Sequence, residues 1–322
     1  MITVVIPYFQ KSVGVLARAL ASIAAQSPCG LSVHVIIVDD ASPVPAGPEV
    51  ASLGSTPFTV EVITQANGGP GAARNTGLNH APAQTRFIAF LDSDDEWTRD
   101  HLARAVAALQ SGFDFYFADL YQLDQHVSAF ARAGRIDLAQ HDALTGLPSG
   151  LFAYRGGMLE QIIRGNIIGT PTVVYDFHRF KHQRFRVEFT NAGEDYLFWM
   201  ELVHLQARIA FSSQPEVTCG RGVNVYAGSG WGTEQHLLRV HNELKYRKTT
   251  TKLFTLSPAQ QNHVDQSIRD LRTAFIRDVI HRISHRKVLP GSLLSAHFKL
   301  DPMTFILAPV IFLKMFASRL RT

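Results

Sequence analysis

The chain has 322 residues, a length that suggests one large domain with an appendage, or two domains. Its residues are 46% hydrophobic and 18% charged, which is the composition of a globular protein. Its formal net charge of +4 is modest, so charge does not indicate nucleic acid as a partner. The two cysteines, Cys29 and Cys219, lie far apart without a CxxC motif, which argues against a disulfide framework and a thiolate zinc site and favours a reducing compartment.

The N-terminus is predicted to be the first strand rather than a targeting segment. Its apolar run has no positive leader and is cut short by Pro7, unlike a signal peptide. No apolar run approaches the roughly 20 residues that a transmembrane helix needs. We therefore expect a cytoplasmic protein that does not span a bilayer.

The first part of the chain alternates strands and helices. Strands are predicted at 2–6, 33–38 and 58–63, and a helix is predicted from Val15. The strands are mostly apolar on both faces, which is typical of a parallel sheet covered by helices. Ligands bind beyond the carboxyl ends of such strands, so the residues that follow them are the candidates for a site.

The strand predicted at 87–91 ends in a cluster of carboxylates. The three carboxylates are those of Asp92, Asp94 and Asp95, within four positions that also include Ser93. Like charges this close disfavour joint ionisation, and a divalent cation relieves the repulsion. A calcium EF-hand is excluded, because Trp97 stands where that loop needs glycine and Ala103 where it needs glutamate. The Asp-x-Asp pattern suits Mg²⁺ or Mn²⁺ on a diphosphate; the alternative is that these acids only start the next helix.

Residues 67–77 are predicted to form a glycine-rich entry into a helix. A dinucleotide-binding fingerprint is excluded, because its third glycine would fall at Arg74. The free N–H groups of the helix start and Arg74 could instead face a phosphate or a ribose. The alternative is that the glycines only cap a turn and Arg74 is a surface residue.

The middle of the chain is less regular. A helix at 102–109 and a strand at 113–117 precede residues 120–165, where weak patterning predicts irregular, substrate-specific loops. After a strand at 170–175, Glu194 and Asp195 open a helix. Acidic residues in a first turn are favoured by the helix dipole by about 0.3 to 1 kcal/mol, so this pair could also be no more than a helix start.

The C-terminal third has three features of its own. Residues 218–232 are rich in glycine and aromatic residues and are predicted to close over a substrate, with Arg221 on phosphate and Trp231 on a sugar face; the alternative is a surface connector with a buried Trp. A long helix is predicted after Ser257 through a capping box. Residues 303–316 are apolar and flanked by basic residues, which suits shallow insertion at an anionic membrane surface, although the protein's own core or a second subunit could also cover them.

Five motifs, in this order, resemble the signature of family 2 glycosyltransferases, which have the GT-A fold. The motifs are Val-Val-Ile-Pro-Tyr at 4–8, Val-Asp-Asp-Ala-Ser at 38–42, Asn-Gly-Gly-Pro-Gly-Ala-Ala-Arg-Asn at 67–75, Phe-Leu-Asp-Ser-Asp-Asp at 90–95 and Gly-Glu-Asp at 193–195. The resemblance implies an α/β fold of the GT-A type, with a mostly parallel sheet flanked by helices, over residues 1–215. Residues 216–322 would then form a substrate loop and a helical extension that is a candidate for membrane association. The stretch from 220 to 234 also resembles bacterial exopolysaccharide transferases of the succinoglycan type.

The resemblance implies a nucleotide-activated sugar donor, usually linked to UDP. Pro7 and Tyr8 would line the uridine pocket, and Asp40 would accept a hydrogen bond from the uracil. Asn67 and Arg74 would hold the nucleoside and its surroundings. A further histidine often ligates the metal in such enzymes, but His204, His236 and His241 remain equal candidates.

The same resemblance implies the reaction centre. Asp92 and Ser93 would lie near the ribose, while Asp94, with Asp92, would ligate Mn²⁺ or Mg²⁺ on the diphosphate. Asp195 would be the general base that takes the proton of an acceptor hydroxyl, and Glu194 would position the acceptor or the base. One displacement inverts the configuration, so an α-linked donor gives a β-linked product.

The expected reaction is the addition of one sugar, with glucose from UDP-glucose as the first guess, to a glycan acceptor carried on a polyprenyl diphosphate. Such an acceptor would place the protein at the cytoplasmic face of the inner membrane, in contact through residues 301–322; a homodimer is also considered. Two other functions stay open. A sugar nucleotidyltransferase should carry a loop rich in glycine and arginine, with a lysine, straight after its first strand, unlike residues 7–11. A noncatalytic protein that binds nucleotide sugars or glycans would need no base.

Overall fold

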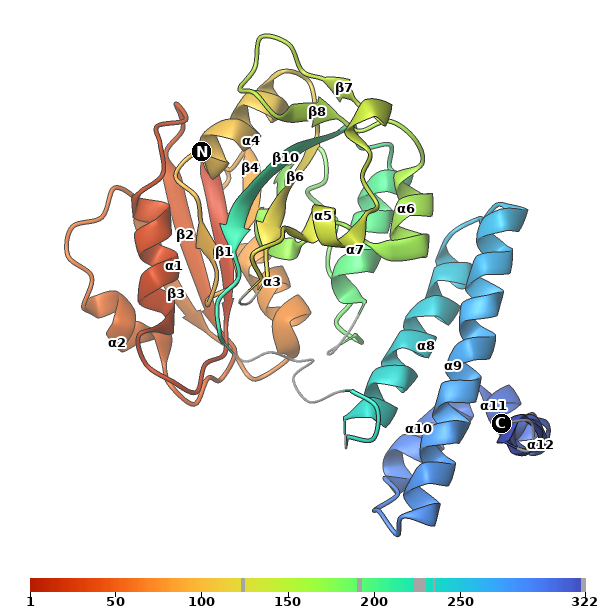
Figure 1. Cartoon of the computed structure of the whole chain (residues 1–322). Helices are drawn as coiled ribbons and strands as arrows, with labels where there is room; N and C mark the ends of the chain where they lie inside the picture. Colours follow the sequence, from red (N-terminus) through yellow and green to blue (C-terminus); the bar gives the residue numbers. More distant parts are fainter. Residues whose placement is uncertain (123–124, 190–192, 223–229, 234, 320–322) are drawn as a thin grey trace. The chain divides into compact units, whose positions relative to one another are not determined.

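The computed structural model describes residues 1–122, 125–189, 193–222, 230–233 and 235–319, with side chains described up to residue 313. The chain divides into two compact units, Met1–Thr190 with Glu194–Asn224, and Asn191–Gly193 with Val225–Thr322. Most of the helices and strands are labelled in Figure 1. The functional division at residue 215 stays a prediction; the last strand of the first unit continues to Thr218.

A parallel half-sheet forms the start of the first unit, as the apolar strands predict. Its strands are β1 (Ile2–Tyr8), β2 (Val33–Asp39), β3 (Thr59–Thr64) and β4 (Phe87–Phe90), in the order β3-β2-β1-β4. Strand β1 pairs in parallel with both β2 and β4, so the carboxyl ends of these three strands meet at one edge. This edge carries Tyr8, Asp40 and Asp92.

Beyond β4 the sheet is mixed. The added strands are β9 (Val174–Asp176), β6 (Phe115–Tyr121), β10 (Ile209–Thr218), β8 (Leu151–Ala153), β7 (Asp142–Ala143) and β5 (Glu96–Trp97). Strand β9 is antiparallel to β4 and to β6, whereas β6 and β10 are parallel. The predicted α/β sheet is therefore confirmed. Its continuous run of parallel strands ends at β4, and parallel and antiparallel pairs mix beyond that strand.

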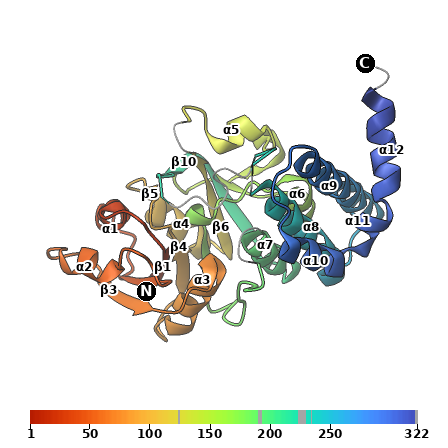
Figure 2. The same cartoon turned by 90° about the horizontal axis from the view of Figure 1, so that it is seen from below.

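Helices cover both faces of this sheet (Figure 2). Helices α1 (Val15–Ala24) and α4 (His101–Gln110) pack on the face that includes Val4 and Ile37. Helix α3 (Gly69–His80) packs on the other face, where Ala73 contacts Ile36 and Val38. Gly77 allows this approach, because a Cβ there would lie 2.4 Å from a Val5 methyl group.

The region between β6 and α7 (Glu194–His204) is more ordered than the sequence predicts. Residues 120–165 contain α5 (Ala129–Ala133), a 3₁₀ turn at Leu138–Gln140, β7, β8 and α6 (Met158–Gly165). The strand predicted at 170–175 is a 3₁₀ turn, Thr170–Thr172, followed by the short β9. A short helix α2 (Ala46–Ala51) follows β2. These elements are too short to give a clear periodicity.

A buried ion network fastens β10 to α4. The Glu216 carboxylate accepts hydrogen bonds from His101 Nδ1 at 2.9 Å, Arg104 Nε at 2.6 Å and the Tyr116 hydroxyl at 2.8 Å. Its backbone carbonyl accepts from Thr98 N at 2.8 Å. Burial alone would raise the pKa of Glu216, but His101, Ser212 and Arg104 together hold it below its usual value. Strand β10 is thereby tied to the segment that follows the acidic cluster.

The second unit is helical. Its helices are α8 (His236–Leu253), α9 (Pro258–Ser284), α10 (Gly291–Leu300), α11 (Pro302–Ile306) and α12 (Ala308–Arg319). The predicted capping box is confirmed, with Ser257 and Gln260 bonded reciprocally at the start of α9. Buried His297 stacks on Phe275 at 3.5 Å and contacts His241 Nδ1 at 3.0 Å. The Asp301 carboxylate forms ion pairs with Lys248 Nζ at 2.9 Å and with Arg272 Nε at 2.7 Å.

The apolar tail is divided between a packed and an exposed face. Phe305, Ala308 and Ile311 pack against the core of the second unit. Ile306 and Leu313 are 65% and 66% exposed. Within the described residues, no helix combines the length and the apolar character that crossing a membrane requires.

Candidate active site

Asp40 holds the glycine-rich entry into α3. Its Oδ1 accepts hydrogen bonds from Gly68 N at 2.8 Å and Gln65 Nε2 at 2.7 Å, and its Oδ2 accepts from Gly69 N at 2.8 Å. Its backbone carbonyl accepts from Asn67 Nδ2 at 2.9 Å. The side chain is 3% exposed. A carboxylate offers about four acceptor sites, so the predicted uracil contact would have to use the one that remains.

Arg74 joins the end of β4 to the start of α7. Its Nη2 lies 2.7 Å from Asp92 Oδ1, its Nη1 lies 3.6 Å from Glu194 Oε1, and the guanidinium sits 5.4 Å above the Phe185 ring. The residue is 4% exposed, so the alternative that Arg74 is a surface residue is wrong. Within the described part of the chain, its buried Nε and Nη1 have no hydrogen-bond acceptor. The guanidinium therefore has more N–H groups than the acceptors around it satisfy.

The two acids at the start of α7 lie next to Arg74. Burial raises the pKa of Glu194 to about 7, with a contribution from Asp195 and an opposing one from Arg74. Burial also raises the pKa of Asp195, whose Oδ1 accepts from Tyr196 N at 2.8 Å and whose Oδ2 lies 3.4 Å from Thr170 Oγ1. A carboxylate with a raised pKa is a better proton acceptor than an ordinary one. The predicted residues Arg74, Asp92, Glu194 and Asp195 are thus brought together.

The acidic cluster is held by the segment that leaves β10. Gly222 N donates to Asp94 Oδ2 at 2.7 Å, and Gly220 N donates to Asp95 Oδ1 at 2.9 Å. Burial, then the charges of Asp92 and Asp94, raise the pKa of Asp95 to about 8. Burial and Asp92 also raise the pKa of Asp94. The expected crowding of charge is therefore present.

The two glycines of this segment were not predicted as partners of the acidic cluster. A Cβ on Gly220 would lie 1.6 Å from the Asp94 carbonyl oxygen, and a Cβ on Gly222 would lie 2.5 Å from Asp94 Cγ. Only glycine fits at such distances from backbone and carboxylate. The available signal was the Gly-x-Gly spacing directly after a strand, which the sequence alone does not connect to residues 94 and 95.

The fit of a metal ion can be tested on these contacts. Within the described residues, no three His, Cys, Asp or Glu side chains are grouped to hold one. Asp92 and Asp94 supply two carboxylates at the strand end, and Mg²⁺ in nucleotide sites commonly uses one or two carboxylates with phosphate and water oxygens. The residues present therefore fit a cation that takes its remaining ligands from a diphosphate and from water. Of the candidate histidines, His236 is bonded to Asp278 at 2.9 Å and His241 to His297, both within the second unit.

The remaining predicted residues are more dispersed. Pro7 is half-buried in β1, and buried Tyr8 donates from its hydroxyl to Glu49 Oε1 at 3.3 Å. Ser93 is buried and accepts from Gln10 Nε2 at 2.9 Å. Tyr8 and Ser93 therefore each have a structural contact in addition to any ligand.

The predicted lid is described only in part, because residues 223–229 lie outside the described residues. Arg221 belongs to the first unit and lines a cavity. Trp231 belongs to the second unit, is 47% exposed, and lies beneath the Arg277 guanidinium at 4.6 Å from the ring centroid. The buried Trp of the connector alternative is thus not found at this position.

Comparison with known proteins decides the family. The family model for glycosyl transferase family 2 matches residues 3–173. The chain is also 32% identical over 305 residues to the succinoglycan biosynthesis protein ExoW of Rhizobium meliloti (strain 1021), with 94% of each chain covered. The chain belongs to glycosyltransferase family 2. This family 2 glycosyltransferase is further similar to ExoO of the same organism, at 38% identity over 96 residues, which cover 30% of this chain and 26% of ExoO.

Solved structures agree on the fold. S. aureus TarS 1–349 in complex with UDP-GlcNAc superposes with a TM-score of 0.54 at 19% identity, covering 86% of this chain and 82% of TarS 1–349. The mannosyltransferase PcManGT from Pyrobaculum calidifontis, in complex with GDP-Man and Mn²⁺, superposes with a TM-score of 0.55 at 16% identity, covering 96% and 86%. The predicted GT-A type of fold is confirmed for this glycosyltransferase, and its family favours glycosyl transfer over nucleotidyl transfer.

Proposed function

We propose that the protein transfers one sugar from a nucleotide donor to a hydroxyl of a glycan acceptor during exopolysaccharide assembly. The observation that carries this proposal is the bridge from Asp92 through Arg74 to Glu194, which joins the expected donor and base positions. The similarity to ExoW over nearly the whole chain supports the exopolysaccharide assignment. UDP-glucose is the first donor to try.

The donor would bind at the strand ends that carry Asp40, Arg74 and Asp92. The buried Nε and Nη1 of Arg74 suit an oxygen of ribose or phosphate. Solved relatives were captured with UDP-GlcNAc and with GDP-Man, so both nucleotides belong in the assay. Asp92 and Asp94 would hold Mn²⁺ or Mg²⁺ against the diphosphate, where the cation would neutralise charge on the leaving nucleotide.

Asp195 would act as the general base. The acceptor oxygen would form a bond to the anomeric carbon while the bond from that carbon to the diphosphate breaks, and the hydroxyl proton would pass to the Asp195 carboxylate. Arg74 opposes the effect of burial on the neighbouring acids, since its positive charge lowers the pKa of both Glu194 and Asp195. A single displacement of this kind inverts the configuration and gives a β-linkage from an α-linked donor.

The assay is nucleotide release from UDP-glucose, UDP-GlcNAc and GDP-mannose, with and without Mn²⁺ or Mg²⁺. Asp195→Asn should lower release by about 10²- to 10⁴-fold with nucleotide binding retained, because only proton transfer is removed. Asp94→Ala should remove the dependence on the cation. Asp100→Asn, an exposed aspartate bonded to Ser27, is the matched control. If wild type binds a nucleotide sugar but releases nothing, and Asp195→Asn changes nothing, the noncatalytic alternative is correct.

The acceptor would be a glycan on a polyprenyl diphosphate, met at a membrane surface through residues 301–322. The exposed Ile306 and Leu313 side chains support this contact. Removing the whole tail would also remove buried Asp301 and its ion pairs, so Ile306→Ser with Leu313→Ser is the sharper variant. The double variant should no longer sediment with anionic vesicles. The control is Val187→Ser, which changes another exposed apolar residue and should still sediment with them. A dimer that this double variant converts to a monomer would instead assign the face to a second subunit.

A further inference from the structure

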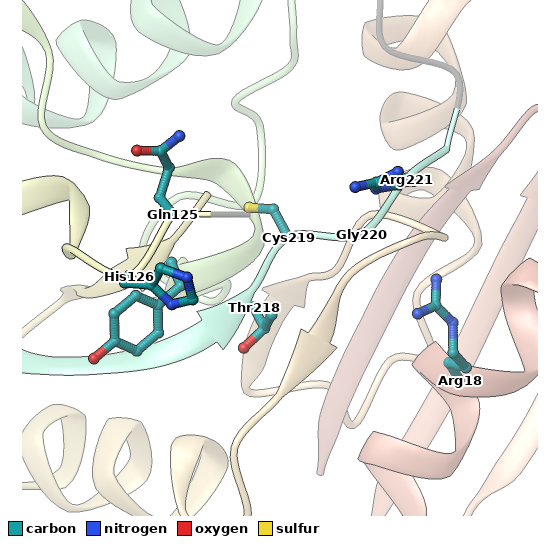
Figure 3. A pocket seen from close by; sticks show the side chains of 8 residues that line it. Arg18, Gln125, His126, Thr218, Cys219, Gly220 and Arg221 are labelled. Atoms are coloured by element: carbon teal, nitrogen blue, oxygen red, sulfur yellow. The ribbon is translucent and has the colours of Figure 1, made fainter. Parts of the chain in front are cut away.

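The cavity that Arg221 lines is also lined by Arg18 of α1, and Figure 3 shows the side chains around it. Its volume is about 590 Å³. Its polar lining comes from α1, from the segment after β6 and from the end of β10. The side chains concerned are Arg18, Tyr121, Gln125, His126, Thr218 and Arg221.

This cavity is distinct from the predicted nucleoside site. Neither Asp40, Asn67 nor Arg74 is among its described lining residues, and Arg221 is the one predicted contact that lines it. The described lining contains two arginines and a histidine but no aspartate or glutamate. Its chemistry is therefore that of a site for an anion.

The backbone of β10 fixes the cavity next to the expected metal ligands. Gly220 and Gly222, on either side of Arg221, donate to Asp95 and Asp94. A Cβ on Gly220 would lie 3.3 Å from Arg18 Nη2, so the Arg18 guanidinium reaches the same stretch of backbone. Both arginines thus stand beside the acidic cluster, and Figure 3 shows them on the same side of the cavity.

Arg18 can exchange its present partner for a ligand. It pairs with Glu96 at 3.2 Å, and both side chains are about half exposed, so this ion pair contributes little. A guanidinium binds phosphate oxygens in a bidentate way, and the cavity is large enough for a diphosphate. A diphosphate also carries more charge than a sugar hydroxyl could offer to two arginines.

We propose that this cavity binds the diphosphate group of a substrate, through Arg18 and Arg221. The inference rests on the proposed function, in which both substrates carry a diphosphate. The group could belong to the sugar nucleotide or to the prenyl carrier of the acceptor. The chemistry recognised is the same in either case, and the following measurement separates the two sources.

Binding of UDP, uridine, inorganic pyrophosphate and farnesyl diphosphate is measured by calorimetry on wild type, Arg18→Gln, Arg221→Gln and the double variant. Each single variant should weaken pyrophosphate binding about tenfold or more, and uridine binding should stay unchanged. Arg164→Gln, an exposed arginine paired with Glu160, is the matched control. The melting temperature should be unchanged in all variants, because the Arg18 side chain is half exposed and glutamine is a polar replacement at both positions.

The two sources give different results. If UDP weakens together with pyrophosphate while farnesyl diphosphate is unaffected, the cavity serves the donor. If farnesyl diphosphate weakens while UDP is unaffected, it serves the acceptor carrier. If neither arginine changes the binding of any diphosphate by more than about twofold, the inference is refuted. Diphosphate binding that depends on both arginines, in a protein that releases no nucleotide from any sugar donor, would refute the proposed function and leave the site standing.

Discussion

Replacing Asp40 by asparagine tests whether its carboxylate is first of all a structural part of the candidate site. The two oxygens accept from different N–H groups, Gly68 on Oδ1 and Gly69 on Oδ2. An amide has one acceptor oxygen, so in either orientation its NH₂ group faces a backbone donor. The less costly orientation keeps Gly68 and Gln65 on the oxygen and leaves the Gly69 N–H without an acceptor.

The expected cost follows from these contacts. One hydrogen bond to a charged group is lost, with a buried donor left unpaired, which costs about 2 to 3 kcal/mol. The free energy of unfolding in urea should fall by this amount, and the melting temperature by about 5–10 °C. Nucleotide affinity should fall as well, because the entry into α3 loses its anchor.

The control for this substitution is Asp100→Asn, which should change the free energy of unfolding by less than about 0.5 kcal/mol, because Asp100 is exposed. An unchanged urea midpoint in Asp40→Asn, together with lost UDP binding, would refute the reasoning. The carboxylate would then serve the ligand alone, as the family resemblance first implied.

Three further substitutions probe the packing of the first unit and of the helical second unit. Glu216→Gln should cost about 3 kcal/mol or more in urea unfolding, since it leaves the buried Arg104 guanidinium without its counter-charge; a loss below 1 kcal/mol would contradict this. Gly77→Ala should cost about 1–3 kcal/mol through its clash with Val5, relieved by Val5→Ala, whereas Gly47→Ala in open space should be neutral. Burial lowers the pKa of His297 to about 4, so as the pH falls the unfolded chain binds this proton before the folded chain does. The free energy of unfolding of the second unit should therefore decrease as the pH falls from 6.5 to 4. His297→Gln should make this free energy depend less on pH over the same range.

The sequence predicts the elements whose burial gives a clear period. The apolar runs of β1, β2 and β4 and the capping box at Ser257 were located within a few residues. Strand β10 was missed, because Ser212, Ser213 and Gln214 break its apolar run and Pro215 lies at a register shift. Strands are recognised in a sequence by a regular run or alternation of apolar residues. Strand β10 lacks it, because it is bulged and buries polar residues such as Ser212 and Glu216.

The candidate site was predicted by residue type but not by pairing. Its acids, Asp92, Glu194 and Asp195, do gather around Arg74 as a shared active centre requires. The contact between Asp94 and Gly222 spans 128 positions, and nothing local marks it. Similarly, three of the acceptor sites of the Asp40 carboxylate are used by hydrogen bonds within the protein, which the motif does not reveal.

The hydrogen bonds from Gly220 and Gly222 to the acidic cluster also bear on how the gene could be shortened or recombined. The region that matches the family, 3–173, stops before β10 and before both glycines. A fragment with that boundary would expose the edge of β6 and deprive Asp94 and Asp95 of their backbone donors. A fragment that is to keep the acidic cluster with its backbone donors should therefore extend at least to Gly222, and chimaeras between relatives should be joined beyond that residue.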